Sequence, residues 1–234
     1  NGNISDDAAA GAVAWNQLFN AVRQRGNIDY FAVQEILDVP QFIDYMIVNQ
    51  FGGNRDWPHN NWYATKGREP GGKWRFHTWD AEFSLRDLNH NLVSGYQAVA
   101  SGEILQRLTI TNGGVPEFRR AFGDALHRHL FNGGLLTPQR NIDWVNETAS
   151  QFERAIVGES ARWGRGSTLE TWRARIAWLT GTYFPQRTNI VINQYRNAGL
   201  YPNTVAPSLL IDGTPQFGGD VFAGAQLSLA GSGG

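Results

Sequence analysis

The sequence contains no cysteine, which excludes disulfide bonds, zinc–thiolate sites and cysteine nucleophiles. It has no apolar run of about 18 residues, so it contains no candidate transmembrane helix. An excess of one charge is missing as well, since 20 Lys and Arg stand against 21 Asp and Glu and the net charge is −1. A near-neutral chain lacks the basic surface that nucleic acids and anionic membranes attract. We therefore expect no nucleic-acid partner and no membrane-spanning segment.

An initiator methionine and a signal peptide are also missing, because the sequence starts at Asn1. This start predicts a processed product or an excised part of a longer multidomain chain. Core material is plentiful: 41% of the 234 residues are hydrophobic, and nine Trp and 13 Phe are among them. A chain of this length and composition is typical of one large globular domain, or of one domain with an appendage.

Helical patterns fill most of the chain. Apolar residues recur at helical intervals, N-cap residues and first-turn prolines precede them, and glycines follow them. We expect helices at about 8–25, 30–37, 40–51, 102–108, 116–131, 138–157, 168–179 and 184–197. After residue 200 the composition shifts to proline, glycine and short alternating runs. The predicted domains are a helical body over residues 1–200 and, over 201–234, a β-rich tail or the start of a following β domain.

One predicted β-hairpin interrupts the helices. Residues 62–65 have strand character, and residues 73–79 alternate polar and aromatic side chains with period two. The segment between them, residues 67–72, is rich in glycine and has strong turn chemistry. Antiparallel pairing around this turn places Asp80 beside Asn61 at the open end of the hairpin. The predicted fold class is therefore mainly α with a small β-hairpin (α+β), plus a short C-terminal β segment.

Acidic and amide side chains are expected to gather at that open end. Asp56 and Asn61 precede the first strand, and Asp80 and Glu82 follow the second. Carboxylate and amide oxygens are hard ligands that suit Mg²⁺ or Mn²⁺. Asn60 competes with Asn61 for the ligand position, and the five-residue spacing from Asp56 selects Asn61. The alternative for Asp56 is an ordinary carboxylate of a surface loop.

The spacing of these residues matches a known catalytic pattern. Arg55-Asp56 followed five residues later by Asn61 copies the protein-kinase catalytic loop His-Arg-Asp-x-x-x-x-Asn. In that loop the Asp receives the hydroxyl proton and the Asn holds a metal. Kinases place a metal-binding Asp behind a following hairpin, and here Asp80 lies 24 residues after Asp56. The pattern predicts metal-assisted phosphoryl transfer to a hydroxyl group.

Several segments carry a wider resemblance. They are Phe42-Ile43-Asp44-Tyr45-Met46, Asn54-Arg55-Asp56-Trp57-Pro58, Asn60-Asn61, Lys73-Trp74-Arg75-Phe76, Trp79-Asp80-Ala81-Glu82 and Glu159-Ser160-Ala161-Arg162-Trp163-Gly164. Through them the chain, from about residue 8 to about residue 201, resembles the spore-coat protein H (CotH) kinases. These are secreted or surface-associated relatives of protein kinases.

The resemblance implies an atypical kinase fold, of which this chain supplies the C-lobe, and a secreted or cell-surface location. It also implies ATP and Mg²⁺ or Mn²⁺ as cofactors, and Ser/Thr hydroxyls of proteins as substrates. By position, Asp56 is then the catalytic residue, and Asn61 and Asp80 are metal ligands. Glu82, a further candidate ligand, stands where many relatives have a second Asp. The chain departs from the family because it contains no glycine-rich N-lobe with a phosphate-binding lysine.

Two other functions stay open. Without an N-lobe the isolated chain is expected to be inactive, and the first alternative is a non-catalytic extracellular scaffold or binding module built on a kinase-like lobe. The second is a glycoside hydrolase that uses two carboxylates across a groove without a metal. The aromatic residues do not distinguish between these functions, because we expect Trp57, Trp62, Trp74 and Trp79 to pack beneath the loop rather than stack on a ligand.

Overall fold

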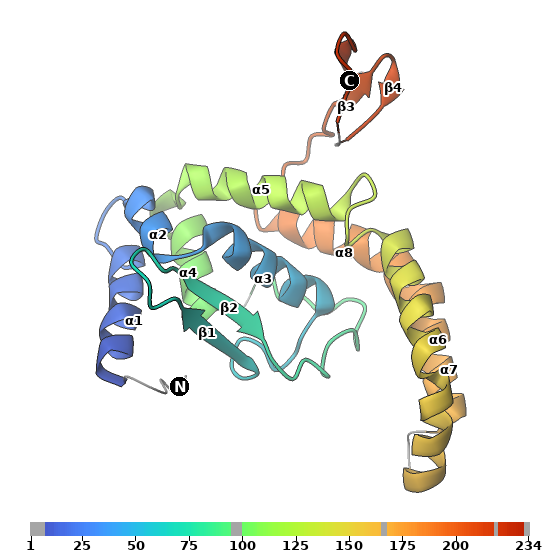
Figure 1. Ribbon diagram of the computed structural model, residues 1–234. Helices are drawn as coiled ribbons and strands as arrows, with labels where there is room; N and C mark the ends of the chain where they lie inside the picture. The colour runs from blue at the N-terminus through green and yellow to red at the C-terminus, as the bar shows by residue number, and fades with distance from the viewer. Residues whose placement is uncertain (1–7, 95–99, 165–167, 218–219, 232–234) are drawn as a thin grey trace.

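Figure 1 shows the computed structural model, which describes residues 8–94, 100–164, 168–217 and 220–231. The helices are α1 (Ala8–Val22), α2 (Tyr30–Ile36), α3 (Val39–Gly52), α4 (Ala100–Thr109), α5 (Pro116–Leu130), α6 (Pro138–Trp163), α7 (Leu169–Trp178) and α8 (Phe184–Asn197), with a 3-10 turn at Thr111–Gly113 and a π-turn at Leu179–Tyr183. The strands are β1 (Trp62–Lys66), β2 (Trp74–Thr78), β3 (Ser208–Ile211), β4 (Thr214–Pro215) and β5 (Leu227–Ala230). The prediction of a mainly α fold with a small β-hairpin is confirmed. The ends of the predicted body and tail, at 1–7 and 232–234, lie outside the described residues.

Two helical regions differ from the sequence expectation. α6 continues to Trp163, beyond the predicted end near residue 157, and Gly164 caps it with φ 51. α7 and α8 are not separated, because the π-turn joins them, and Pro185 lies in the first turn of α8. Proline has no N–H to donate to the carbonyl four residues earlier, so a continuing helix must change its hydrogen-bonding pattern there. Periodicity alone does not reveal such a junction.

α3 lies at the centre of the helical body. The carboxylate of Asp38 caps its N-terminus by accepting the backbone N–H of Gln41 at 3.3 Å. Most of its residues are buried, and it packs against β2, α5 and α8. At its C-terminus Gly53 has φ 60, a left-handed conformation that glycine adopts without strain. α3 therefore delivers the chain into the following loop from a fixed position.

The β1–β2 hairpin packs on α3 through its aromatic face. The strands pair in antiparallel register, with Trp62 opposite Thr78. Phe76 is buried, and its ring centre lies 5.3 Å from that of Phe42 on α3. Gln41 bonds both backbone groups of Phe76, because its Nε2 donates to the carbonyl and its Oε1 accepts the N–H at 2.9 Å. These two bonds attach the outer edge of β2 to α3.

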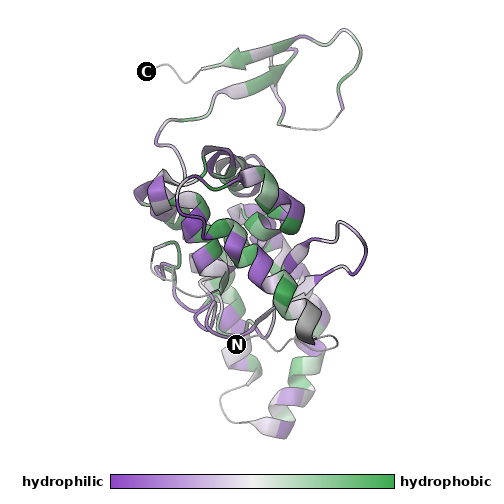
Figure 2. Cartoon of the chain, turned by 90° about the vertical axis from the view of Figure 1, so that its left-hand side faces the viewer, coloured by the Kyte–Doolittle hydropathy of each residue, from purple (hydrophilic) through white to green (hydrophobic). Residues whose placement is uncertain are grey.

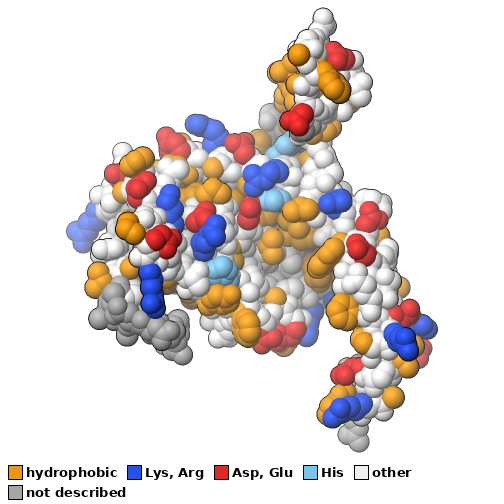
Figure 3. All heavy atoms as spheres, viewed as in Figure 1, with side chains coloured by type: hydrophobic (Ala, Val, Ile, Leu, Met, Phe, Trp, Pro, Cys, Tyr) orange, Lys and Arg blue, Asp and Glu red, His pale blue; other side chains and the backbone are white. Residues whose placement is uncertain are grey.

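The remaining elements extend away from this centre. α6 and α7 pack against each other and project from the body, as Figure 1 shows. β3 pairs with β4 on one side and β5 on the other, and this three-stranded C-terminal β unit (residues 208–230) stands off the helical body in Figure 2. Apolar side chains lie open on it (Figure 3), and Phe222 is 93% exposed.

A buried arginine joins α8 to α3. Arg187 is 0% exposed, and its guanidinium donates three hydrogen bonds to backbone carbonyls. Nε reaches Phe51 at 2.8 Å, Nη2 reaches Gln50 at 2.9 Å, and Nη1 reaches Leu88 at 2.7 Å. The first two carbonyls belong to the last turn of α3, where unpaired carbonyls carry partial negative charge. One side chain therefore closes α3 and also holds the loop that follows the hairpin.

We expect Arg187→Met to destabilise the fold by about 3 kcal/mol, because the carbonyls of Gln50, Phe51 and Leu88 each lose a charged donor at once. Arg187→Lys keeps the charge but not the planar fork, so its cost falls between those of wild type and Arg187→Met. Urea unfolding at neutral pH measures both. Arg140→Met, at an exposed position of α6, is the matched control and should stay within about 0.5 kcal/mol of wild type. A stability of Arg187→Met equal to that of the control contradicts the assignment.

Candidate functional site

The candidate site begins where α3 ends. The backbone N–H of Gly53 bonds the carbonyls of Asn49 and Gln50, which closes the helix. A Cβ on Gly53 would lie 3.5 Å from the Cβ of His90 and would require a left-handed φ, so glycine suits this turn. The loop of residues 54–61 follows directly and leads into β1. The position of the loop is thus set by the end of a buried helix.

Asn61 lies at the junction of the two halves of the site. Its Nδ2 donates to the carboxylate Oδ2 of Asp56 at 3.1 Å and to the backbone carbonyl of Asp80 at 3.0 Å. The backbone N–H of Trp79 bonds the carbonyl of Asn61 at 2.9 Å, which continues the hairpin pairing by one residue. The structure therefore brings Asp56, Asn61 and Asp80 together, as the hairpin geometry predicts. Asn61 fills the position between the two acidic residues.

Glu82 lies two residues beyond Asp80 and is exposed. Its backbone carbonyl accepts a hydrogen bond from Nε of Arg86 at 3.2 Å. Among the hydrogen bonds of the described residues, none joins the carboxylate of Glu82 to Asn61 or Asp56. Its role as a metal ligand stays a prediction.

The backbone is strained at several points around the site. Asn61, Asp80 and Leu85 have φ values of 59°, 47° and 58°, in the left-handed region. Asn and Asp tolerate this region, whereas for leucine it is unusual. Leu85 is held by its N–H, which bonds the carbonyl of Gly52 at 2.6 Å, and by its own carbonyl, which accepts from Arg175 of α7. Strain of this kind persists where the surroundings hold it, and it concentrates at functional sites.

The oxygen ligands present suit a hard divalent cation that takes its remaining ligands from phosphate and water. Asp56 is half-buried and Asp80 is exposed, so both carboxylates are accessible. With Nδ2 of Asn61 donating to both neighbours, the amide Oδ1 is left to serve as a ligand. Mg²⁺ is typically bound through one or two carboxylates plus substrate oxygens. The described ranges contain no group of three or more His, Cys, Asp and Glu residues that could hold a metal without such help.

An ion pair lies next to the candidate catalytic residue. Arg55, which precedes Asp56, donates from Nη2 to Oδ2 of Asp87 at 2.9 Å. The backbone N–H of Asn89 bonds the other carboxylate oxygen of Asp87 at 3.0 Å. This backbone bond, followed by the contact with Arg55, lowers the pKa of Asp87. The pair connects the Asp56 loop to the loop that follows Asp80, and both partners are exposed enough for its energy to be small.

The aromatic residues confirm the packing prediction with one exception. Trp57 and Trp74 are buried, and the ring of Trp62 stacks on Phe76. Trp79 is the exception, because it is 65% exposed beside Asp80. The reason is the alternation of side chains along the strand: Trp74 and Phe76 face the core, so Trp79, an odd number of residues further on, lies on the opposite, exposed face.

No sequence pattern identified the side chains that support the loops. Arg187 and Arg175 come from helices about a hundred residues away along the chain, and no local pattern points to their contacts. Asn49 and Asn54 form a buried amide pair at the end of α3. The only sequence signal available for them is their polar character inside an otherwise apolar stretch, which suggests buried partners.

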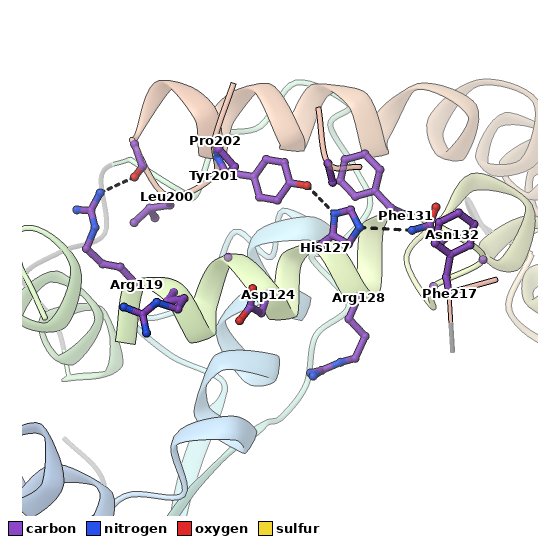
Figure 4. A pocket seen from close by; sticks show the side chains of 16 residues that line it. Arg119, Asp124, His127, Arg128, Phe131, Asn132, Leu200, Tyr201, Pro202 and Phe217 are labelled. Atoms are coloured by element: carbon purple, nitrogen blue, oxygen red, sulfur yellow. Dashed lines mark hydrogen bonds between the residues drawn. The ribbon is translucent and has the colours of Figure 1, made fainter. Parts of the chain in front are cut away.

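A cavity of about 940 Å³ lies elsewhere, between α5 and the segment that follows α8 (Figure 4). None of its lining residues belongs to the predicted site. Two of its arginines already have partners, because Arg119 donates to the backbone carbonyls of Thr109 and Gly199, and Arg128 pairs with Asp44 at 3.0 Å. In Figure 4 these two side chains extend in different directions. The cavity therefore offers no convergent set of charged groups.

Comparison with known proteins gives a single line of evidence. A family model described as CotH kinase protein matches residues 10–191, which span the hairpin and the whole Asp56–Asp80 region. Neither the curated proteins nor the solved structures yield a match. Within the described residues, every helix is too short or too polar to cross a bilayer. Since the matched span covers well over half of the sequence, the chain belongs to the CotH kinase family.

Proposed function

We propose that this chain is the catalytic lobe of a kinase that transfers phosphate from ATP to Ser/Thr hydroxyls of secreted or surface proteins. The observation that carries the proposal is the position of Asn61, whose Nδ2 donates both to the carboxylate of Asp56 and to the backbone carbonyl of Asp80. Family membership supports a kinase-like protein. The residue spacing and the bonded contacts together favour the phosphoryl-transfer reading over a chance cluster of polar residues.

Each residue has a defined task in this proposal. Asn61 occupies Oδ2 of Asp56, so Oδ1 of Asp56 is the oxygen that orients the acceptor hydroxyl and takes its proton. Oδ1 of Asn61 and the carboxylate of Asp80 would hold Mg²⁺ or Mn²⁺, with Glu82 as a further candidate ligand. The cation would supply positive charge that offsets the charge developing on the transferred phosphate. The chain itself contributes positioning and charge, which supply most of the acceleration in phosphoryl transfer.

The C-terminal β unit fits a multidomain protein. We propose that residues 1–200 form the kinase-like lobe and that 201–234 belong to a β domain. By register, Leu209 lies opposite Leu229 and Ile211 opposite Leu227, so these four side chains share one face of the sheet. An apolar sheet face needs a covering layer to be stable. Here Leu227 and Leu229 are exposed, which supports a place for this unit in a larger β structure.

A second candidate is a non-catalytic scaffold. One observation favours it. The described residues form two sheets, the hairpin and the C-terminal β unit, and neither sheet contains a glycine-rich nucleotide-binding loop. The scaffold interpretation predicts that the wild-type polypeptide transfers no phosphate.

We expect Asp56→Ala and Asp80→Ala each to lower phosphoryl transfer by about 100-fold or more, because one removes the hydroxyl-orienting carboxylate and the other a metal ligand. The measurement is incorporation of labelled γ-phosphate into a Ser/Thr-rich protein by the full natural polypeptide, with Mn²⁺ and ATP. Asp124→Ala, an exposed carboxylate on α5, is the control and should keep wild-type activity. Unchanged phosphoryl transfer in both site variants contradicts the roles assigned to Asp56 and Asp80. Absence of transfer by wild type favours the non-catalytic scaffold.

A further inference from the structure

A buried amide at the end of α3 connects both halves of the candidate site. Asn49 is 2% exposed and Asn54 is 1% exposed. Oδ1 of Asn49 accepts from Nδ2 of Asn54 at 3.1 Å. Nδ2 of Asn49 donates to the hydroxyl of Thr78 at 2.9 Å and to the carbonyl of Tyr45, one turn earlier, at 2.9 Å. The Asn49 amide thus joins the end of α3 to the following loop through Oδ1 and to β2 through Nδ2.

The partners of Asn49 stand at equivalent places relative to the two acidic residues. Asn54 lies two residues before Asp56, and Thr78 lies two residues before Asp80. The backbone N–H of Asn54 also bonds the carbonyl of Asn49 at 3.2 Å. One side chain on a rigid buried helix therefore holds the approach to Asp56 and the approach to Asp80 at the same time.

Burial makes these bonds directional restraints rather than incidental contacts. In a low-dielectric interior a hydrogen bond is stronger, and a buried donor or acceptor that loses its partner pays the full cost of its lost hydration. The side chains of Asn54 and Thr78 would each lose this partner if the amide of Asn49 moved. The ion pair of Arg55 and Asp87 connects neighbouring segments too, but its exposure leaves it weaker.

We propose that Asn49 is a positioning residue that sets the separation between Asp56 and Asp80, acting through Asn54 and Thr78. The inference rests on the proposed function. Asn49 touches neither acidic residue, so its effect is one of placement. A displacement of about 1 Å at a reacting group can lower a rate by about 100-fold, so small shifts transmitted by these bonds are measurable.

Thr78→Val gives the sharpest test, because it removes one hydroxyl and leaves the shape of the side chain nearly unchanged. We expect it to lower kcat of phosphoryl transfer by about 10-fold to 100-fold at little change in KM, and Thr78→Ser to restore the rate. Asn49→Leu should do at least as much. Thr109→Val is the matched control, since it deletes a buried hydroxyl that bonds the carbonyl of Leu105 in α4. It should cost similar stability and leave kcat unchanged.

A second readout does not depend on activity. The side-chain NH₂ of Asn61 bridges Asp56 and Asp80, so its NMR signals report their relative placement. We expect these signals to shift in Thr78→Val but not in Thr109→Val. If they shift while wild type transfers no phosphate, positioning by Asn49 stands and the proposed function fails. If they and kcat respond alike in Thr78→Val and Thr109→Val, the proposal for Asn49 is overturned.

Discussion

The buried guanidinium of Arg187 is the interaction on which the rest of the structure depends. It lies against the C-terminal carbonyls of α3, and among the described residues no carboxylate forms an ion pair with it. Burial lowers the pKa of Arg187, and the partial negative charge at the helix end compensates the cost of burying the cation. Tyr183, one helical turn earlier, donates to the carbonyl of Phe51 as well, so two side chains hold the same helix end. α8 thereby fixes the point from which the loop with Asp56 departs.

The geometry of the site follows from that fixed point. The end of α3 carries Asn49, which bonds both approaches to the site, and the loop beyond it carries Asp56. The hairpin returns the chain to Asn61, whose amide reaches Asp56 and Asp80. Asp56 and Asp80 are therefore joined through Asn61, and the approaches to both are bonded to Asn49 at the end of α3. Such placement is what phosphoryl transfer requires of a protein, since positioning and charge provide most of its rate enhancement.

Local patterns predicted the parts of this arrangement that depend on local sequence. The glycine-rich turn and the period-two strands gave the hairpin, and the hairpin gave the proximity of Asn61 and Asp80. The family and the mainly α fold are confirmed as well. Long-range contacts such as Arg187 with Leu88 were not predictable, because no periodicity links positions 99 residues apart. The catalytic role of Asp56, the cofactors and the secreted location depend on ligands or context outside the fold and stay predictions.

Calorimetric titration of Mn²⁺ into this chain, with and without ATP, tests the central claim most directly. The claim is that Asp80 and Asn61 form a cation site. The account predicts binding that falls by about 10-fold or more in Asp80→Ala and is kept in Asp124→Ala, with ATP strengthening it because phosphate oxygens complete the coordination. Equal Mn²⁺ affinity in wild type and Asp80→Ala, or no binding to wild type in the presence of ATP, would contradict the account.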